Sequence, residues 1–217
     1  ECLPCFNSVI IEHHLHKIPG LSEHFLYGND DMYFNKPVTP DTFFAKDLLP
    51  IIRFNRRPFR KWYLLFKTKV VGKQLSNYLQ TIHNAALLVE KKYGTYYSGK
   101  THHNIDAYLK SNYEHTRQVF DKEISATLTN HVRSMNDIQR NIYSYVPLAE
   151  KRAHMQYVTQ RTSFRFHIDN RKLYRKFEKY NPMLFCMNDS QFANDDDRKC
   201  AINFLANLFP DKSQFEK

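Results

Sequence analysis

Apolar runs that stop abruptly at Asn and Asp residues occur twice in this chain. Residues 25–28 (FLYG) are followed by Asn29-Asp30-Asp31, and residues 183–187 (MLFCM) by Asn188-Asp189-Ser190. Each pattern is typical of a short buried strand that carries polar side chains at its end. Because ligand sites in open α/β sheets lie at the carboxyl ends of strands, both segments predict such a site.

Helical spacing of apolar residues marks four other segments. We expect helices over residues 74–93, 105–125, 138–146 and 198–209. Gly94 is a plausible end for the first of them, and Pro147 is expected to end the third. Helices alternating with strands predict an α/β fold with a central sheet flanked by helices.

The segment before the first acidic run, residues 6–18, is compatible with a helix or with a strand. On a helix, Glu12 and His16 would share a face, whereas on a strand His14 would join them. In both cases a carboxylate and an imidazole converge. The alternative is an amphipathic segment whose histidines are bonded by backbone groups.

Composition and charge indicate an anionic partner. The chain has 217 residues, 42% of them hydrophobic, and a formal net charge of +10. Residues 51–73 and 149–180 are strongly basic, and the first of these is also aromatic. A polyanion-binding strip, which stacks aromatics and contacts phosphates, and an exposed hairpin with charged outer positions both fit residues 51–62. The charge also keeps open a nucleic-acid-binding module as an alternative function.

No apolar run reaches the roughly 20 residues of a membrane span, and no signal peptide is visible. The cysteines are Cys2, Cys5, Cys186 and Cys200. Free thiols in a reducing cytoplasm are the favoured interpretation, and a zinc site using Cys2, Cys5 and nearby histidines is the minor one. These observations favour a cytoplasmic location.

Several polar residues are candidates for phosphate chemistry. Adjacent carboxylates such as Asp30 and Asp31 commonly hold Mg²⁺ or Mn²⁺, although Asn and Asp also form ordinary turns. His102-His103 lies on a polar loop, and Arg133 precedes a predicted helix, where an anion is favoured, or else pairs with Asp137 at the surface. A metal-dependent phosphohydrolase built on the same carboxylates and histidines is a second alternative.

The stretch from 6 to 44 resembles the second conserved block of the Stealth family. The resemblance is carried by Asn7-Ser8, Ile11-Glu12, His14-Leu15-His16, Ile18-Pro19-Gly20-Leu21-Ser22, Phe25-Leu26-Tyr27 and Asn29-Asp30-Asp31. A third block is matched more loosely at Asn84-Ala85-Ala86, Gly94, His102-His103, Leu109-Lys110-Ser111 and His131-Val132-Arg133. Residues 182–217 resemble the fourth block closely, whereas the family's opening block has no counterpart here.

The family consists of sugar-1-phosphate transferases: bacterial capsular-polysaccharide phosphotransferases and the α/β subunit of the lysosomal-enzyme GlcNAc-1-phosphotransferase. The resemblance implies that residues 1–217 are the C-terminal part of one catalytic domain with a nucleotide-diphosphosugar transferase (GT-A-like) fold. Its blocks lie at about 6–44, 84–146 and 182–217, with a mainly helical, basic middle section. The N-terminal part of the same enzyme would be a further partner.

The resemblance further implies transfer of a hexose-1-phosphate, expected to be N-acetylhexosamine-1-phosphate, from a UDP-sugar to a hydroxyl of a growing capsular polysaccharide, with release of UMP. The expected catalytic residues are His102, His103, Arg133, Glu12 and Asp31. The expected substrate-binding residues are Asn7, His14, His16, Asn29, Asn84, His131 and Asn188, and the expected Mg²⁺ or Mn²⁺ ligands are Asp30, Asp31 and Asp189.

The expected partners follow from the same resemblance. They are the UDP-sugar and an anionic capsular acceptor, which suits the basic strips, and not nucleic acid. A peripheral contact with the inner membrane and the capsule export machinery is left open. In the eukaryotic branch of the family the acceptor would instead be a mannose glycan.

Overall fold

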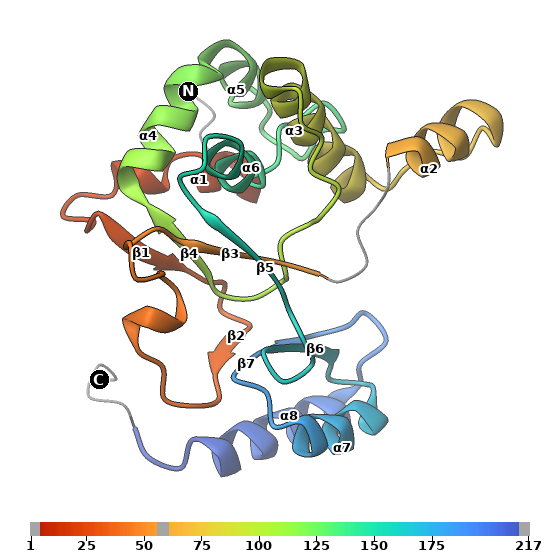
Figure 1. The fold of residues 1–217 in the computed structure, drawn as a ribbon. Coiled ribbons are helices and arrows are strands. Elements are labelled where there is room, and N and C mark those ends of the chain that lie inside the picture. The colour runs from red at the N-terminus through yellow and green to blue at the C-terminus, as the bar shows by residue number, and fades with distance from the viewer. Residues whose placement is uncertain (1–4, 56–60, 213–217) are drawn as a thin grey trace. The chain divides into compact units, whose positions relative to one another are not determined.

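The computed structural model describes residues 5–55 and 61–212, and the chain divides into two compact units (Figure 1). Unit 1 consists of Glu1–Tyr27, Pro40–His102 and Asp106–Tyr157. Unit 2 consists of Gly28–Thr39, His103–Ile105 and Val158–Lys217. Each unit is therefore assembled from three separate stretches of sequence, and each is described by itself.

Unit 1 combines short strands with most of the helices. The antiparallel pair is β1 (His24–Tyr27) with β4 (Asp106–Leu109), and the parallel pair is β3 (Ile51–Phe54) with β5 (His154–Tyr157). Its α-helices are α1 (Ser8–Glu12), α2 (Lys61–Leu65), α3 (Asn77–Tyr93), α4 (Lys110–Val119), α5 (Asp121–Thr127) and α6 (Ile142–Ala149). A π turn (Phe66–Val70) continues α2, and single 3₁₀ turns lie at Leu15–Lys17 and Pro40–Thr42.

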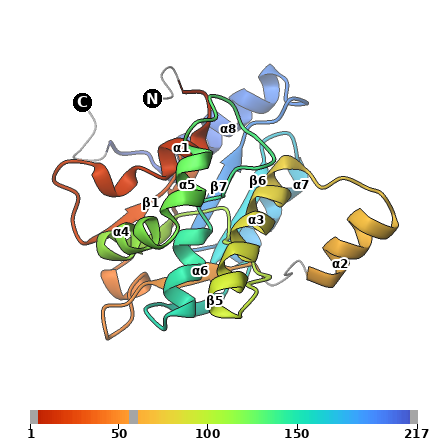
Figure 2. The same ribbon diagram turned by 90° about the horizontal axis from the view of Figure 1, so that it is seen from above.

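The core of unit 1 lies where α3 packs on α6, which run side by side in Figure 2. Ile82 and Ala86 of α3 are fully buried with Tyr145 and Val146 of α6, so the apolar stripe predicted from spacing is the packed face of α3. The helix begins where the Ser76 hydroxyl accepts from the Leu79 N–H, at 3.3 Å. It ends at Gly94, whose φ of 74° suits a residue without a Cβ.

Unit 2 is a three-stranded sheet with two helices. The strands are β2 (Met32–Phe34), β6 (Ser163–His167) and β7 (Leu184–Asn188), in the order β2-β7-β6, and the helices are α7 (Arg171–Tyr180) and α8 (Asp195–Leu208). Strand β7 is antiparallel to β2 and parallel to β6. Its core is aromatic, with Phe166, Phe177, Phe185 and Phe204 in mutual ring contact.

The predicted α/β class is confirmed, but the expected single central sheet is not present. The described strands form three small sheets instead. The GT-A-like fold stays a prediction. The expected helix over 105–125 is wrong at its start, because Asp106–Leu109 is strand β4, and the helices α4 and α5 follow it. Pro147 lies inside α6, which continues to Ala149, so the expected end at that proline is also wrong.

The structure also tests the secondary structure predicted for shorter segments. Residues 6–18 follow the helical alternative, and the apolar runs before Asn29 and Asn188 are strands. Residues 51–62 are not a hairpin in their described part, since β3 ends at Phe54 and α2 begins at Lys61. Residues 56–60 of that basic strip, and Cys2 of the alternative zinc site, lie outside the described residues. No helix in the described ranges combines the length and the apolar character that crossing a membrane requires.

Candidate functional site

Asp31 and Asn188 meet in unit 2 because β2 begins where the antiparallel strand β7 ends. The Met187 N–H donates to the Asp31 carbonyl at 2.9 Å, which fixes the two chain segments side by side. The side-chain amide of Asn188 donates to Oδ2 of the Asp31 carboxylate. The two acidic runs that the sequence marks therefore converge within one sheet.

His103 and Cys186 complete a four-residue cluster, which we call the Asp31 cluster. His103 Nε2 lies 3.7 Å from Asp31 Oδ2, and Cys186 Sγ lies 3.3 Å from the same oxygen. One ligand atom each from Asp31, His103 and Cys186 lies within 4.8 Å of the others, which is close enough for a shared cation. The side chains of His103 and Asp31 are 33% and 21% exposed, whereas Cys186 is fully buried.

The electrostatics of the Asp31 cluster favour a hydrogen-bond donor or a cation beside the Asp31 carboxylate. Asp31 Oδ1 is buried and accepts no hydrogen bond from any described residue. An unpartnered buried carboxylate oxygen is costly, so it fits a cation or a ligand donor. Burial raises the pKa of the Cys186 thiol, and the Asp31 charge raises it further, so the thiol stays protonated and donates to Asp31. A protonated thiol is a poor ligand for a hard cation such as Mg²⁺.

Arg165 lies next to the Asp31 cluster and orients it. Its Nε donates to Asn188 Oδ1 at 2.8 Å, which turns the Asn188 NH₂ group toward Asp31. The other predicted residues nearby point elsewhere. Asn29 and Asp30 are exposed, and Asp189 forms an exposed ion pair with Arg198 at 3.2 Å. A backbone hydrogen bond from Ser190, with the Arg198 contact, lowers the pKa of Asp189.

Glu12 belongs to a buried charge network in unit 1. Arg140 lies between two carboxylates, with Nε 3.6 Å from Glu12 Oε2 and NH1 3.1 Å from Asp106 Oδ2. The guanidinium also lies over the Tyr27 ring, 4.6 Å from its centroid. Glu12 Oε2 and Arg140 Nε have no hydrogen-bond partner among the described residues, although each is buried. Burial, with the charge of Glu12, raises the pKa of Tyr27 to about 12.

The two adjacent histidines have different surroundings. His102 is buried in unit 1, where its Nε2 lies 3.3 Å from Asp106 Oδ1. His103 belongs to unit 2 and is part of the Asp31 cluster, with a third of its side chain exposed. Of the pair, only His103 therefore combines exposure with a position beside the predicted metal ligand Asp31.

Two predicted binding residues, Asn7 and Asn84, support the loop 130–137. The Asn7 amide donates to Asp137 Oδ2 at 2.8 Å, and its Oδ1 accepts from the Val9 N–H at the start of α1. The Asn84 amide donates to the carbonyls of Met135 and Asp137. His131 and Arg133 on this loop are exposed, and Arg133 donates to the Ser8 hydroxyl at 2.8 Å. Asp137 is bonded by Asn7, Asn130 and Ser134 rather than by Arg133.

The histidines of the opening segment are held in unit 1. His16 is buried beside the Tyr113 ring, and His14 is half-buried. Burial lowers the pKa of both imidazoles, and Lys17 lowers it further. Both are therefore neutral at pH 7, which suits a hydrogen-bonding role better than a charge-neutralising one.

Sequence reasoning missed Arg140, Asp106, Cys186 and Arg165 as members of these clusters. A signal existed for Asp106, because it lies alone between apolar residues, whereas Arg140 lies among the polar residues Gln139 and Asn141 just before α6 and nothing in the sequence marks it. Cys186 was interpreted only as a free thiol, and nothing in the sequence distinguishes Arg165 from the other basic residues around it.

The chain is similar in sequence to a known conserved region and to several known proteins. Residues 1–52 match "Stealth protein CR2, conserved region 2". The chain is 32% identical over 219 residues to the capsular polysaccharide phosphotransferase fcs1 of Haemophilus influenzae, covering 96% of this chain and 58% of that protein. It is 29% identical over 228 residues to the capsular polysaccharide phosphotransferase SacB of Neisseria meningitidis serogroup A, covering 100% of this chain and 41% of that protein.

A third relative is the exopolysaccharide phosphotransferase CpsY of Mycobacterium tuberculosis, at 30% identity over 233 residues, with 100% of this chain and 41% of that protein covered. The chain thus spans about half the length of the curated relatives it matches. The conserved region at residues 1–52 contains Glu12 and Asp31, and the similarity to phosphotransferases extends through Asn188. Residues 1–52 therefore match the second conserved region of the Stealth family, and the chain as a whole is similar to capsular and exopolysaccharide phosphotransferases.

Proposed function

We propose that this chain forms part of a capsular polysaccharide phosphotransferase that uses the Asp31 cluster to transfer a sugar-1-phosphate. The donor would be a UDP-sugar, expected to carry an N-acetylhexosamine, and the acceptor a hydroxyl of a growing capsular polysaccharide. The single observation that carries the proposal is the buried Asp31 Oδ1, which has no partner in the described residues and lies beside His103 and Asn188. The family relationship supplies the class of reaction.

The step would be a phosphoryl transfer. The acceptor oxygen attacks the phosphorus next to the sugar and forms a new P–O bond, while the bond from that phosphorus to the bridging oxygen breaks. UMP leaves with that oxygen, and the product is a phosphodiester between sugar and acceptor. Positioning and neutralisation of phosphate charge dominate such catalysis.

His103 is the proposed base. Its Nε2 lies 3.7 Å from Asp31 Oδ2, so the carboxylate can stabilise the imidazolium that forms when the acceptor proton is taken. His102 is the proposed positioning residue for His103, because it is buried against Asp106 and immediately precedes His103 in the chain. The predicted catalytic pair thus receives two different roles.

Mg²⁺ or Mn²⁺ fits the carboxylate of Asp31, whose Oδ1 accepts no hydrogen bond from the described part of the chain. Asn188 and His103 stand next to it, and Asp30 is the adjacent exposed carboxylate, whereas Asp189 is directed to Arg198. When bound, the ion would neutralise charge on the diphosphate. Arg165, already bonded to Asn188, would add positive charge beside the cluster, and Arg133 on its exposed loop stays a predicted phosphate contact.

The test is a transferase assay that scores UMP release from UDP-GlcNAc and UDP-ManNAc with Mg²⁺ and a capsule oligosaccharide primer. It is run on the chain alone and on the chain joined to the N-terminal segment of a relative, because the chain spans about half of its relatives' length. Primer-dependent UMP release that His103→Ala abolishes would support the proposal. Free sugar phosphate formed without any primer would instead indicate a metal-dependent phosphohydrolase. No UMP from either form, with tight nucleic-acid binding that weakens in salt, would indicate the binding module.

A further inference from the structure

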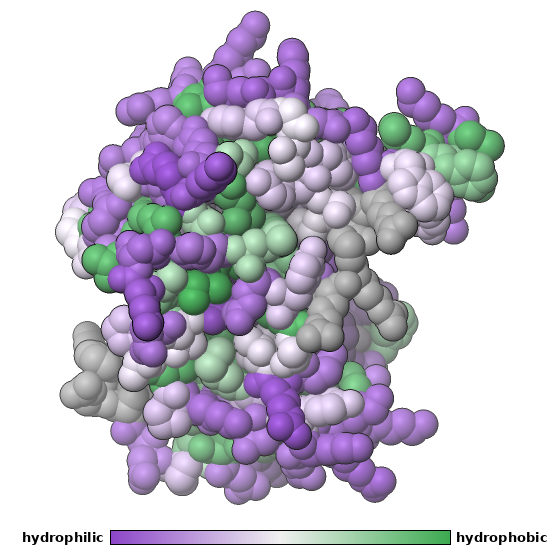
Figure 3. Space-filling view, in the orientation of Figure 1, coloured by the Kyte–Doolittle hydropathy of each residue, from purple (hydrophilic) through white to green (hydrophobic). Residues whose placement is uncertain are grey.

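An apolar face on α2 and the following π turn is exposed to solvent. Trp62, Tyr63, Phe66, Val70 and Val71 are exposed by 62%, 51%, 51%, 70% and 58%, respectively, and we call these five residues the α2 face. In the space-filling view, green hydrophobic atoms lie on the segment at the upper right of Figure 3, among pale and purple ones. Single exposed apolar residues are normal, but five within ten positions are a local concentration of exposed apolar side chains.

Helix geometry explains why these side chains lie together. Residues four apart share a face of an α-helix, which aligns Trp62 with Phe66. The π turn Phe66–Val70 is closed by the Val71 N–H, which donates to the Phe66 carbonyl at 3.1 Å, an i→i+5 bond. In this wider turn, residues four and five apart share a face, so Val70 and Val71 both lie under Phe66. The π turn therefore extends the apolar face by two valines.

Basic residues accompany the α2 face. Lys67 and Lys69 belong to the π turn itself, and Lys73 follows it, bonded through its N–H to the Lys67 carbonyl at 3.0 Å. Lys69 and Lys73 are exposed. The sequence between Asp47 and Glu90 contains no acidic residue at all. The segment is therefore both apolar and cationic, with no internal counter-charge.

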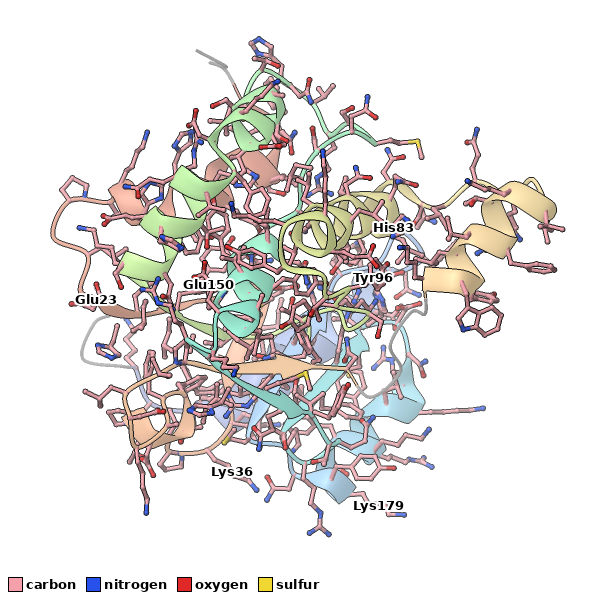
Figure 4. The ribbon with its side chains drawn as sticks, turned by 45° about the horizontal axis from the view of Figure 1, so that its top comes forward. Glu23, Lys36, His83, Tyr96, Glu150 and Lys179 are labelled. Atoms are coloured by element: carbon pink, nitrogen blue, oxygen red, sulfur yellow. The ribbon has the colours of Figure 1, made fainter. Side chains whose placement is uncertain are left out.

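The opposite side of α2 is attached to unit 1. Leu64 is 1% exposed, and Lys61 Nζ lies 2.6 Å from Glu90 Oε2 on α3. Lys61 also lies over the Tyr96 ring, whose hydroxyl is 2.7 Å from His83 Nδ1 on α3 (Figure 4). These contacts hold α2 with its apolar face directed away from the rest of unit 1, and α2 extends outward from α3 in Figure 2.

We propose that the α2 face docks on an anionic lipid surface. Tryptophan and tyrosine favour the boundary between headgroups and acyl chains, and phenylalanine and valine are buried below it. Lysines beside such a face reach the anionic headgroups while their methylene stems stay at the apolar boundary. An acidic polysaccharide would use the lysines and stack on the aromatics, but it offers nothing apolar to cover Val70 and Val71. The proposal does not depend on the transferase reaction.

Trp62 makes the test direct, because it is the only tryptophan of the chain. Its fluorescence is measured while the 217-residue chain is titrated with vesicles of phosphatidylcholine, with or without phosphatidylglycerol. We expect the emission to shift to shorter wavelength, and brominated lipid to quench it, only when phosphatidylglycerol is present. Added salt should weaken the binding, because the lysines contribute through their charge. An unchanged spectrum with anionic vesicles would overturn the proposal.

Matched variants localise the contact. Phe66→Glu should weaken partitioning into anionic vesicles about tenfold or more, whereas Phe192→Glu, the same change at an aromatic residue that is 78% exposed in unit 2, should leave it within about twofold. Removing one charge by Lys69→Gln should weaken it about fivefold, and the exposed Lys179→Gln on α7 (Figure 4) serves as its control. Circular-dichroism melting checks that each variant is folded. Equal losses in the test and control variants would overturn the assignment to the α2 face.

A polysaccharide contact is the competing outcome, and it is measured in the same assay. An acidic polysaccharide is added in place of vesicles, and then as a competitor with them. A Trp62 shift produced by the polysaccharide alone, lost in Phe66→Glu and accompanied by no vesicle binding, would assign the α2 face to the acceptor and overturn the lipid proposal. Vesicle binding that survives the competitor supports it.

Discussion

The side-chain amide of Asn188 donates to the carboxylate of Asp31, although 157 positions separate these residues in the chain. The antiparallel pairing of β2 with β7 produces this contact, since the start of one strand lies at the end of the other. His103 and Cys186 then surround the same carboxylate oxygen. The proposed chemistry depends on this convergence at Asp31.

Replacing Asp31 by Asn removes the charge that would hold the cation but keeps the size of the side chain. We expect Asp31→Asn to lower sugar-1-phosphate transfer about 100-fold or more, because a preorganised charge at the reacting phosphate is lost. UMP release by the active form of the enzyme measures the effect. Asp195→Asn is the matched control, since that carboxylate is 92% exposed and lies outside the Asp31 cluster. Undiminished transfer in Asp31→Asn would exclude the assigned role.

Cys186 makes the Asp31 cluster sensitive to thiophilic metals. Zn²⁺ accepts thiolate, imidazole and carboxylate ligands, and the cluster offers all three. We expect Zn²⁺ to bind the chain about tenfold more weakly in Cys186→Ser than in Cys200→Ser. Its affinity should rise with pH, because burial raises the pKa of the Cys186 thiol, and binding must release that proton. Calorimetric titration at two pH values measures both effects, and equal affinity in the two variants would contradict the prediction.

Arg140 should be a large contributor to the stability of unit 1. Arg140→Met would leave Glu12 and Asp106 as buried carboxylates without their common cation, and we expect a loss of about 3–5 kcal/mol in the free energy of unfolding. Arg133→Met, at an exposed arginine, should change it by about 0.5 kcal/mol or less. Urea denaturation followed by circular dichroism compares the two. Similar small losses would mean that water replaces the guanidinium.

His13 should make the chain acid-sensitive. Its ring is fully buried, with Nδ1 2.8 Å from the Tyr143 hydroxyl and Nε2 2.8 Å from the Ile138 carbonyl, and burial lowers its pKa from 6.5 to about 4. The unfolded chain therefore binds more protons between these pH values, and stability falls as the pH decreases from 6.5 toward 4. Titration of His13 alone should lower the free energy of unfolding by about 3 kcal/mol over this pH range.

The measurement for His13 is the urea midpoint as a function of pH. His13→Gln keeps an amide that can bond both partners and removes the titration, so its stability should depend less on pH in this window. His24→Gln is the control at an exposed imidazole. A pH dependence that is the same in both variants would assign the acid sensitivity to other groups, such as His14 and His16, whose pKa values burial also lowers.

Local patterns predicted β1, which ends shortly before Asp31, and β7, which carries Asn188, because a short apolar run before Asn and Asp is typical of a strand; β2, which pairs with β7, was not predicted. The pairing of Asp31 with Asn188 follows from strand order, which no local pattern contains. Residues 105–109 illustrate the opposite case. Ile105, Tyr108 and Leu109 have helical spacing, but Asp106–Leu109 is buried on both faces and paired with β1, so tertiary packing decides in favour of a strand.

The contacts between buried charged residues were also not predicted from the sequence. Arg140 is interpreted from sequence as one residue of a helix, and only the fold shows that Glu12 and Asp106, from α1 and β4, reach it. The same applies to His102 and His103, which are equivalent in sequence and belong to different units. Their separation reflects where the chain passes from one unit to the other, which side-chain chemistry does not encode.

The chain passes between the units at Tyr27–Gly28, Thr39–Pro40, His102–His103, Ile105–Asp106 and Tyr157–Val158. A gene fragment that begins at Val158 would encode β6 and β7 but neither β2 nor His103. One that ends at Tyr157 would encode β2 without β7, the strand with which β2 pairs. Neither unit can thus be inherited, swapped or expressed as a contiguous cassette. Recombination between relatives would have to exchange the whole interval from Gly28 to Asn188 to keep the Asp31 cluster together.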